Sequence, residues 1–195
     1  MANIDRPAGL KPVRYLNGAP WNGKARMYYC RSDYATALFI GDTVKSGGSA
    51  DTLGKYATIE ASGAGGNIRG VVIGFSDQPY VAFDADNLYR KYKPASTAMY
   101  CLVVDDPDVI FEIQEDNADN DIDADMVGLN TDVVATAGNT GSGISGYELD
   151  SSGTGTGTAQ CRILGLVDRE DNALGTHAKW EVLINEHELK SVTGV

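Results

Sequence analysis

The sequence lacks several features on which common function classes depend. No run of about 20 apolar residues occurs, so no segment is expected to span a bilayer as a helix. The first residues, MANIDRPAGLKPVRYL, lack the apolar core of a secretory signal. Only three cysteines are present, Cys30, Cys101 and Cys161, and they are far apart with no CxxC pair. A disulfide framework or zinc site is therefore not expected. We expect instead that the thiols are reduced and buried, as in a protein made in a cytoplasm.

Basic residues are scarce as well. The chain of 195 residues has 16 Lys and Arg against 27 Asp and Glu, a net charge of −11. Such a balance argues against nucleic acid as a partner, because binding phosphates needs a basic face, and against an anionic membrane surface. Residues 1–100 carry a net +4 and residues 101–195 a net −15, with no Lys or Arg between Lys93 and Arg162. We interpret that acidic stretch as a solvated surface, with an acidic face for a basic partner as the alternative.

Catalytic motifs are also missing. The only histidines, His177 and His187, lie in a turn and in a polar segment, where a solvent-exposed or loop-capping role is expected. No G-x-S-x-G elbow, phosphate-binding loop or dinucleotide-binding G-x-G-x-x-G is present. We therefore predict no catalytic residue, no cofactor and no enzyme activity.

The acidic loop 115–125 invites a calcium interpretation, because Asp119, Asp121 and Asp123 have the spacing of an EF-hand loop. However, Ala124 stands where the sharp turn needs glycine, and Asn130 stands where a bidentate glutamate belongs. We predict no metal site here.

Short apolar or alternating segments between turn residues predict a mainly β fold, either a small β-barrel or a β-sandwich with long loops. Gly70 and Gly74, inside a buried strand, indicate bends or a close approach of backbones. Residues 138–158 are expected to form a surface excursion, and residues 84–93 could hold one short helix. The expected strands are 25–34, 37–44, 56–61, 68–75, 99–104, 109–114, 160–168 and 178–185.

Residues 1–24 are predicted to form an extended N-terminal arm, because proline and glycine interrupt them too often for a helix. The arm should lie against its own body or against a neighbouring subunit, since it also has large apolar side chains. Residues 25–195 form the β-rich body, for which a weak internal echo suggests two related units, 25–98 and 99–195. The candidate contact residues of the arm are Leu10, Val13, Tyr15, Leu16 and Trp21.

Several stretches together resemble the small virion proteins that tailed bacteriophages encode beside the major capsid protein, in particular head decoration (cement) proteins. The stretches are Pro7–Val13, Gly18–Gly23, Asp105–Pro107 with Gln114–Asp116, Arg162–Asp168 and Ala178–Asn185. The resemblance implies a β-rich subunit, made in the bacterial cytoplasm, on the outer surface of the expanded capsid. It also implies a homo-oligomer, a trimer as first expectation and a dimer next, that clamps neighbouring major capsid proteins.

A carbohydrate- or receptor-binding β module on the virion, as in a head fibre, is the alternative. Its stacking faces would come from aromatic residues, and the acidic loop could hold Ca²⁺. The candidate aromatic residues are Tyr80, Phe83, Tyr89, Tyr92 and Tyr147.

Overall fold

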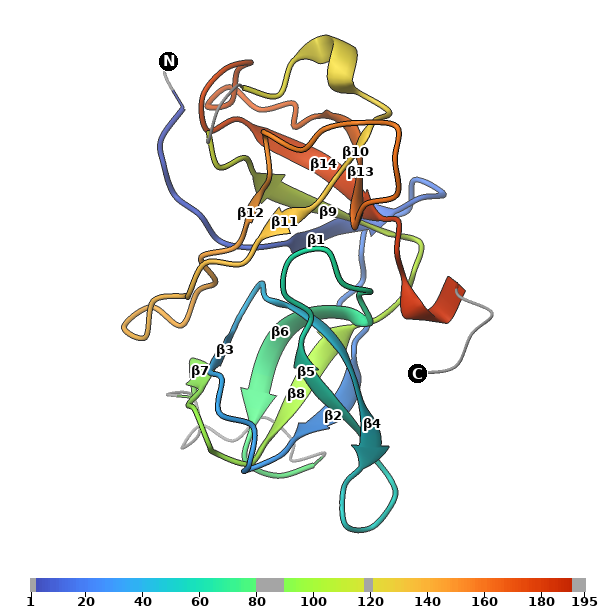
Figure 1. Ribbon diagram of the computed structural model, residues 1–195, viewed down its shortest axis with the longest axis vertical. Helices are drawn as coiled ribbons and strands as arrows, with labels where there is room; N and C mark the ends of the chain where they lie inside the picture. The colour runs from blue at the N-terminus through green and yellow to red at the C-terminus, as the bar shows by residue number, and fades with distance from the viewer. Residues whose placement is uncertain (1–2, 80–89, 118–120, 191–195) are drawn as a thin grey trace.

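The chain forms a closed five-stranded barrel with an open five-stranded sheet stacked over one end of it, as Figure 1 shows for this computed structural model. The structure describes residues 3–79, 90–117 and 121–190. The predicted mainly β fold is confirmed. Within the described ranges, no helix is long and apolar enough to cross a membrane.

The barrel closes in the order β2-β5-β4-β6-β8, with antiparallel neighbours except for β2 and β5, which pair in parallel at Tyr29 and Thr58. Its interior forms the barrel core, to which β2 contributes Tyr28 and Cys30 and β8 contributes Cys101 and Val103. These positions alternate along each strand, as expected where one face of a strand is buried. The strands are β2 (Arg26–Cys30), β4 (Thr43–Ala50), β5 (Ala57–Ala61), β6 (Gly70–Ser76) and β8 (Met99–Val104).

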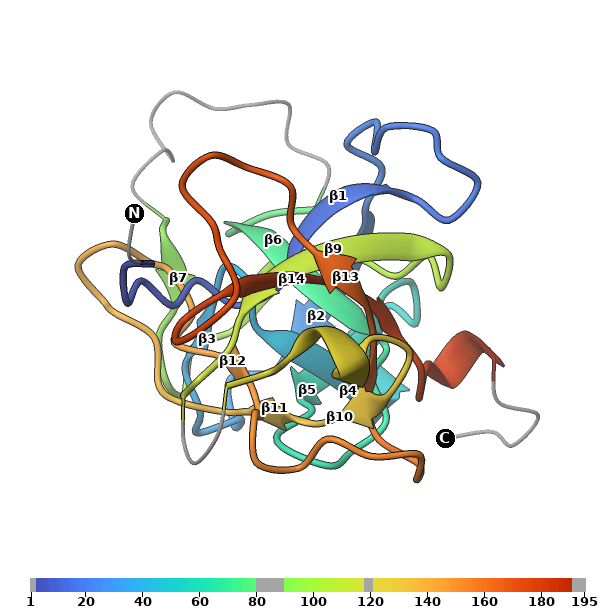
Figure 2. The ribbon, with the colours of Figure 1, turned by 90° about the horizontal axis from the view of Figure 1, so that it is seen from above.

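The open sheet is antiparallel throughout, in the order β1-β9-β14-β13-β10, and the view from above in Figure 2 shows it lying over the barrel strands. Its strands are β1 (Lys11–Tyr15), β9 (Val109–Gln114), β10 (Asn130–Thr131), β13 (Cys161–Leu166) and β14 (Lys179–Ile184). The other described strands form two short pairs, β3 (Leu38–Phe39) with β7 (Tyr92–Lys93) and β11 (Val133–Val134) with β12 (Glu148–Leu149). There are also two described 3₁₀ turns, η2 (Ala124–Met126) and η3 (Glu188–Lys190).

The main core lies between the sheet and the covered end of the barrel. On β14, Trp180, Val182 and Ile184 are buried while the residues between them are half-exposed, as expected for a strand with one buried face. From the barrel, Val71 and Val104 pack into the same cluster. Because this core takes residues from both units, the barrel and the sheet stabilise each other.

The predicted division at residues 98 and 99 does not coincide with this architecture. Strand β8 closes the barrel by pairing with β2 and β6, so the barrel extends to Val104 and the turn 105–108 joins the two units. The sheet takes its edge strand β1 from the N-terminal arm, although the rest of it follows the barrel in sequence. A closed barrel and an open sheet also differ in strand order, so the internal echo has no counterpart in the topology.

The two glycines of β6 occupy different surroundings. A Cβ on Gly70 would lie 2.3 Å from the carbonyl oxygen of Val104 and 2.7 Å from Cγ1 of Val103. A Cβ on Gly74 would lie 3.5 Å from the nearest atom, in the side chain of Leu102. The predicted close approach of backbones therefore exists at Gly70 and not at Gly74.

We expect Gly70→Ala to lower the free energy of unfolding by about 2 kcal/mol, because the methyl group must displace a neighbouring strand. Gly74→Ala is the matched control and should be neutral or slightly stabilising, since alanine restricts the unfolded chain. Urea unfolding followed by circular dichroism measures both. Equal effects of the two substitutions would contradict the packing described at Gly70.

Candidate functional site

The N-terminal arm is folded onto the chain's own body. Strand β1 pairs with β9, with Lys11 opposite Glu112 and Tyr15 opposite Val109. Trp21 donates its backbone N–H to the carbonyl of Val13 at 3.1 Å, so the chain turns back along β1 after residue 16. Of the two expected positions for the arm, the structure shows the one against its own body.

The structure divides the five candidate arm residues into three groups. Leu10 is only 1% exposed and belongs to the main core, so it offers no surface to another subunit. Tyr15 and Trp21 are half-buried and pack against that core. Val13 and Leu16 point outward, with 39% and 52% of their surface exposed. Of the five, these last two have the most exposed side chains in the structure of the single chain.

Both edges of the open sheet are occupied in part by the chain's own loops. At β1, the N–H of Tyr15 is bonded to the carbonyl of Ala19 at 2.8 Å. At β10, Asn130 and Gly155 exchange two backbone hydrogen bonds of 2.8 and 2.9 Å. Since an open edge is what strand addition requires, a partner is expected to bind side chains on this sheet rather than extend it.

An open hollow of about 600 Å³ lies beside the arm. It has an apolar wall on the arm side, at Leu16, and two carboxylates, Asp106 and Asp108, from the turn between the barrel and the sheet. A second hollow of about 290 Å³ shares Lys24 and Asp106 with the first and is bordered by Leu189. The two adjoin, and they combine exposed apolar side chains with charges of both signs. Nothing in the sequence indicated that Leu189 and the turn carboxylates lie beside the arm, because the fold alone brings them together.

The acidic stretch is not the uniformly solvated surface that its composition suggests. Asp105 is 5% exposed and Glu115 is fully buried. Three carboxylates of the stretch, Asp105 among them, are paired with cations of the same chain that lie far away in sequence. These ion pairs are Arg26–Asp105 at 3.2 Å, Lys190–Asp108 at 3.3 Å and Arg169–Glu112 at 3.0 Å.

A buried polar network joins the C-terminal 3₁₀ turn to the barrel. Tyr28 donates its hydroxyl to Asp105 at 2.6 Å and accepts the Nε–H of Arg69 at 2.9 Å. Glu188, in turn, accepts hydrogen bonds from the N–H and hydroxyl of Ser46 at 2.9 and 2.5 Å and lies 3.9 Å from Arg69. Burial, and then the bond to Asp105, raise the pKa of Tyr28 to about 12, so the phenol remains a donor. Such a network fixes the position of η3 rather than preparing a reactive group.

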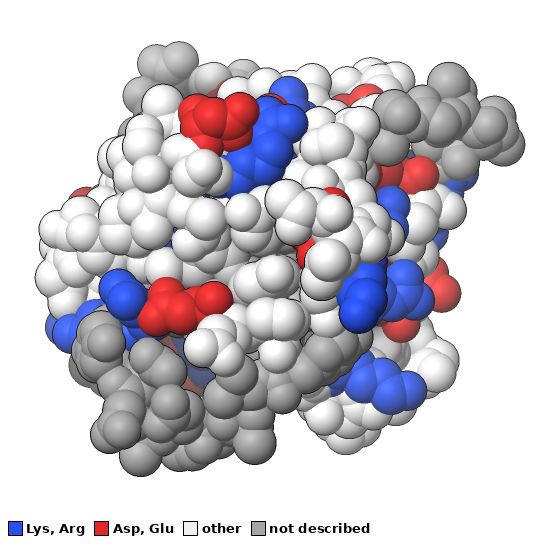
Figure 3. All heavy atoms as spheres, turned by 90° about the horizontal axis from the view of Figure 1, so that it is seen from below, with Lys and Arg blue, Asp and Glu red and all other residues white. Residues whose placement is uncertain are grey.

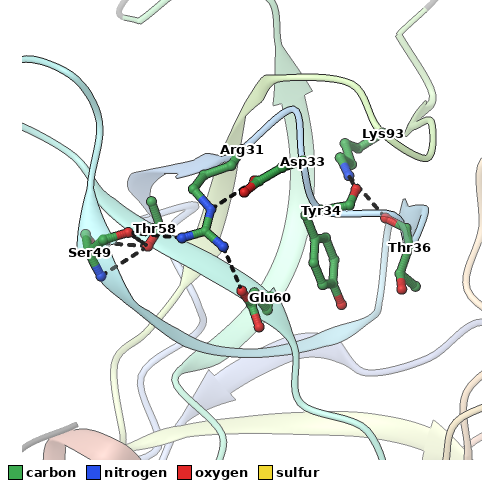
Figure 4. A network of polar contacts seen from close by, with 8 residues as sticks. All are labelled: Arg31, Asp33, Tyr34, Thr36, Ser49, Thr58, Glu60 and Lys93. Atoms are coloured by element: carbon green, nitrogen blue, oxygen red, sulfur yellow. Dashed lines mark hydrogen bonds and ion pairs between the residues drawn. The ribbon is translucent and has the colours of Figure 1, made fainter.

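A second network lies where β2 ends (Figure 4). Arg31 contacts Asp33 at 3.0 Å and Glu60 at 3.4 Å. Lys93 is fully buried, and its ammonium donates to the carbonyls of Tyr34 and Thr36 at 2.8 and 3.0 Å. The lysine thereby holds the loop 31–37 onto β7. The short helix considered for 84–93 is not present at its C-terminal end, where the structure has the strand β7 instead. Residues 84–89 of that segment lie outside the described residues.

The carboxyl groups with the most strongly shifted pKa values have structural roles. Burial raises the pKa of Asp42 to about 6, and its carboxylate accepts the N–H of Phe39 at 2.8 Å. Burial also raises the pKa of Glu115 to about 7, and this group accepts the N–H of Ile122 at 2.7 Å. Neither residue lines the two adjoining hollows.

The three cysteines are buried and free, as expected from their spacing. Cys30 and Cys101 face the barrel core, whereas Cys161 lies in the main core. Burial raises the pKa of each thiol, that of Cys161 to about 12, so all three are held in the unreactive protonated form.

The two histidines differ from each other. His187 is only 3% exposed, and its Nδ1 accepts the N–H of Leu189 at 3.1 Å, so it caps the final 3₁₀ turn from a buried position. His177 is half-buried in the turn that precedes β14.

Of the aromatic residues of the carbohydrate hypothesis, one is buried and one is half-exposed with its ring stacked on another. Tyr147 is 6% exposed, and Tyr92 stacks on Phe39 with ring centroids 5.2 Å apart. Tyr80, Phe83 and Tyr89 lie outside the described residues. Of the acidic loop, Asp119 also lies outside them, while Asp123 precedes η2.

Figure 3 shows the barrel end opposite the sheet. The Lys, Arg, Asp and Glu atoms there form small separate groups around a largely uncharged surface. The acidic excess of the chain therefore does not form a continuous patch on the described part of this face.

No protein-family profile, curated protein or solved structure matches this chain.

Proposed function

We propose that this chain is a structural virion protein that binds the outer surface of a phage capsid and stabilises it by clamping neighbouring major capsid proteins. The proposal starts from the sequence resemblance to head decoration proteins. It includes self-association, with a trimer as first expectation, and a location on the virion surface.

The observation that supports this function best is the face formed by the arm and the two adjoining hollows. Leu16 and Leu189 are 52% and 43% exposed and border a concave surface. Large apolar side chains exposed beside a hollow with a polar rim are typical of surfaces that bind another protein. Lys24, Asp106 and Asp108 provide that rim.

The test is co-sedimentation of the purified protein with expanded heads assembled without it. Wild type should bind saturably and with a fixed stoichiometry. Leu16→Asp should weaken binding at least about tenfold, because a carboxylate would be desolvated in the contact. Leu53→Asp, on the loop between β4 and β5, is the matched control because Leu53 is 72% exposed and lies away from the hollows.

Two results would count against the proposal. Wild type that remains in the supernatant at every head concentration refutes capsid binding. Heads that bind Leu16→Asp and Leu53→Asp equally well refute the assignment of the contact to the arm face.

One observation favours the alternative of a glycan-binding module. Tyr29 and Tyr100 are both half-exposed on neighbouring barrel strands, with ring centroids 5.2 Å apart and planes tilted by 50°. Aromatic rings on a β surface can stack on sugars, although these two rings present no flat platform. Tyr100→Ala separates the two functions, since it should abolish binding to a glycan array and leave head binding unchanged.

A further inference from the structure

Three potential metal ligands from distant parts of the chain meet beside the N-terminal segment. Asp5 precedes β1, Glu148 lies on β12, and His177 lies in the turn before β14. One ligating atom from each lies within 4.8 Å of the other two. The fold alone assembles this group, because no sequence motif links positions 5, 148 and 177.

In the described part of the chain, no lysine or arginine lies within ion-pair distance of the two carboxylates. None of the ion pairs among the described residues involves Asp5 or Glu148. The Nδ1 atom of His177 is buried and has no hydrogen-bond partner. A histidine with an unpartnered nitrogen, held beside two carboxylates, is a group that a cation can bind.

A second layer of contacts holds the ligands in place. Gln114 donates its side-chain amide N–H groups to Asp5 and to Glu148, both at 3.2 Å. Its amide oxygen accepts the backbone N–H of Arg6 at 3.0 Å, which fixes which end of the amide faces the carboxylates. Asn3 bonds the turn that carries His177, through the carbonyls of Ala173 and Thr176 at 2.8 and 3.0 Å, among others. Orienting contacts of this kind are characteristic of metal sites.

We propose that Asp5, Glu148 and His177 bind a divalent transition-metal ion, for which Zn²⁺ is the probe, and that the ion fastens the N-terminal segment to the sheet. A nitrogen ligand with two carboxylates suits Zn²⁺ and not Ca²⁺ or Mg²⁺, which prefer oxygen ligands only. Ligands of tetrahedral zinc lie about 3.4 Å apart at bonds of about 2.1 Å, so the group, whose atoms lie within 4.8 Å of one another, closes by up to about 1.4 Å on binding. The exposed Asp5 side chain can supply that movement.

Calorimetric titration of the EDTA-treated, desalted full chain with ZnCl₂ tests the site. One Zn²⁺ should bind per chain and raise the melting temperature by several degrees at saturation, whereas CaCl₂ and MgCl₂ should do neither. Asp5→Asn and Glu148→Gln should each lower the affinity for Zn²⁺ at least about tenfold. Asp171→Asn is the matched control, because that side chain is 67% exposed and lines the hollow next to His177 without belonging to the group.

The two histidines provide an internal control by NMR. Zn²⁺ should shift the imidazole signals of His177 and leave those of the buried His187 unchanged. Absence of binding heat, equal affinity in Asp5→Asn, Glu148→Gln and wild type, or a shift of His187 instead of His177 would each overturn the proposal. These measurements use no capsid, so their outcome is separate from that of the head-binding test.

Discussion

Trp180→Ala should lower the free energy of unfolding by about 3–5 kcal/mol, the largest loss that we expect from a single substitution in this chain. Trp180 is fully buried in the main core between the sheet and the barrel, so its removal leaves a cavity that both units line. Urea unfolding followed by circular dichroism measures the effect. The indole Nε1–H has no partner, so Trp180→Phe should cost less than the volume change alone predicts.

Trp21, the only other tryptophan, is the matched comparison. It is half-buried, packs against the same core from the arm, and donates its Nε1–H to the carbonyl of Lys24 at 3.3 Å. Trp21→Ala should therefore cost only about 1–2 kcal/mol. Each variant retains one tryptophan, whose fluorescence reports on its own surroundings in or beside the main core. Equal losses in Trp21→Ala and Trp180→Ala would show that the arm is as much a part of the core as β14.

The strands that could be predicted from the sequence are those whose side chains alternate or are apolar throughout. The segment expected at 178–185 is β14, and those expected at 99–104 and 109–114 are β8 and β9 with the same bounds. A strand with one buried face alternates apolar and polar residues, and a strand buried on both faces has almost no polar residues. Either pattern can be recognised within the strand's own sequence. The strand expected at 37–44 has the wrong bounds, because the structure has β3 at Leu38–Phe39 and a separate β4 at Thr43–Ala50, in which Gly47 and Gly48 give no such pattern.

The pairing of strands could not be predicted, and it decides the role of the arm. Lys11 lies opposite Glu112, about one hundred residues away in sequence, and nothing near either residue indicates the other. Leu10 therefore looked like an interface residue although it belongs to the chain's own core. A large apolar side chain in a proline- and glycine-rich segment has the same sequence pattern whether it packs against its own chain or against another subunit.

The candidate sites depend on the same long-range information. The acidic stretch looked unpaired because its cations, among them Arg26 and Arg169, lie outside it in sequence. The proposed metal ligands lie in three segments with no common spacing, so they could not be found by a motif search.

The second large effect that we expect is a loss of stability in mild acid through His187. Its burial, together with the nearby cation Lys190, lowers its pKa from 6.5 to about 4; Arg69 acts in the same direction, while Asp105 and Glu188 oppose it. Between these two values the unfolded chain binds a proton that the native chain does not, so stability falls as the pH falls from about 6.5 to 4. The contribution amounts to up to about 3 kcal/mol.

The measurement is the difference between wild type and His187→Asn, because other groups titrate in the same range. Asp42 and Glu115 have raised pKa values of about 6 and 7, so their contributions are lost as the pH rises and partly cancel that of His187. In His187→Asn the amide oxygen can accept the N–H of Leu189, and the titrating group is gone. Urea unfolding of both proteins from pH 4 to 8 should give curves that separate below about pH 6.5, with wild type losing more. Parallel curves over that range would show that protonation of His187 does not lower the free energy of unfolding. The imidazole would then not be held in the buried position described for it.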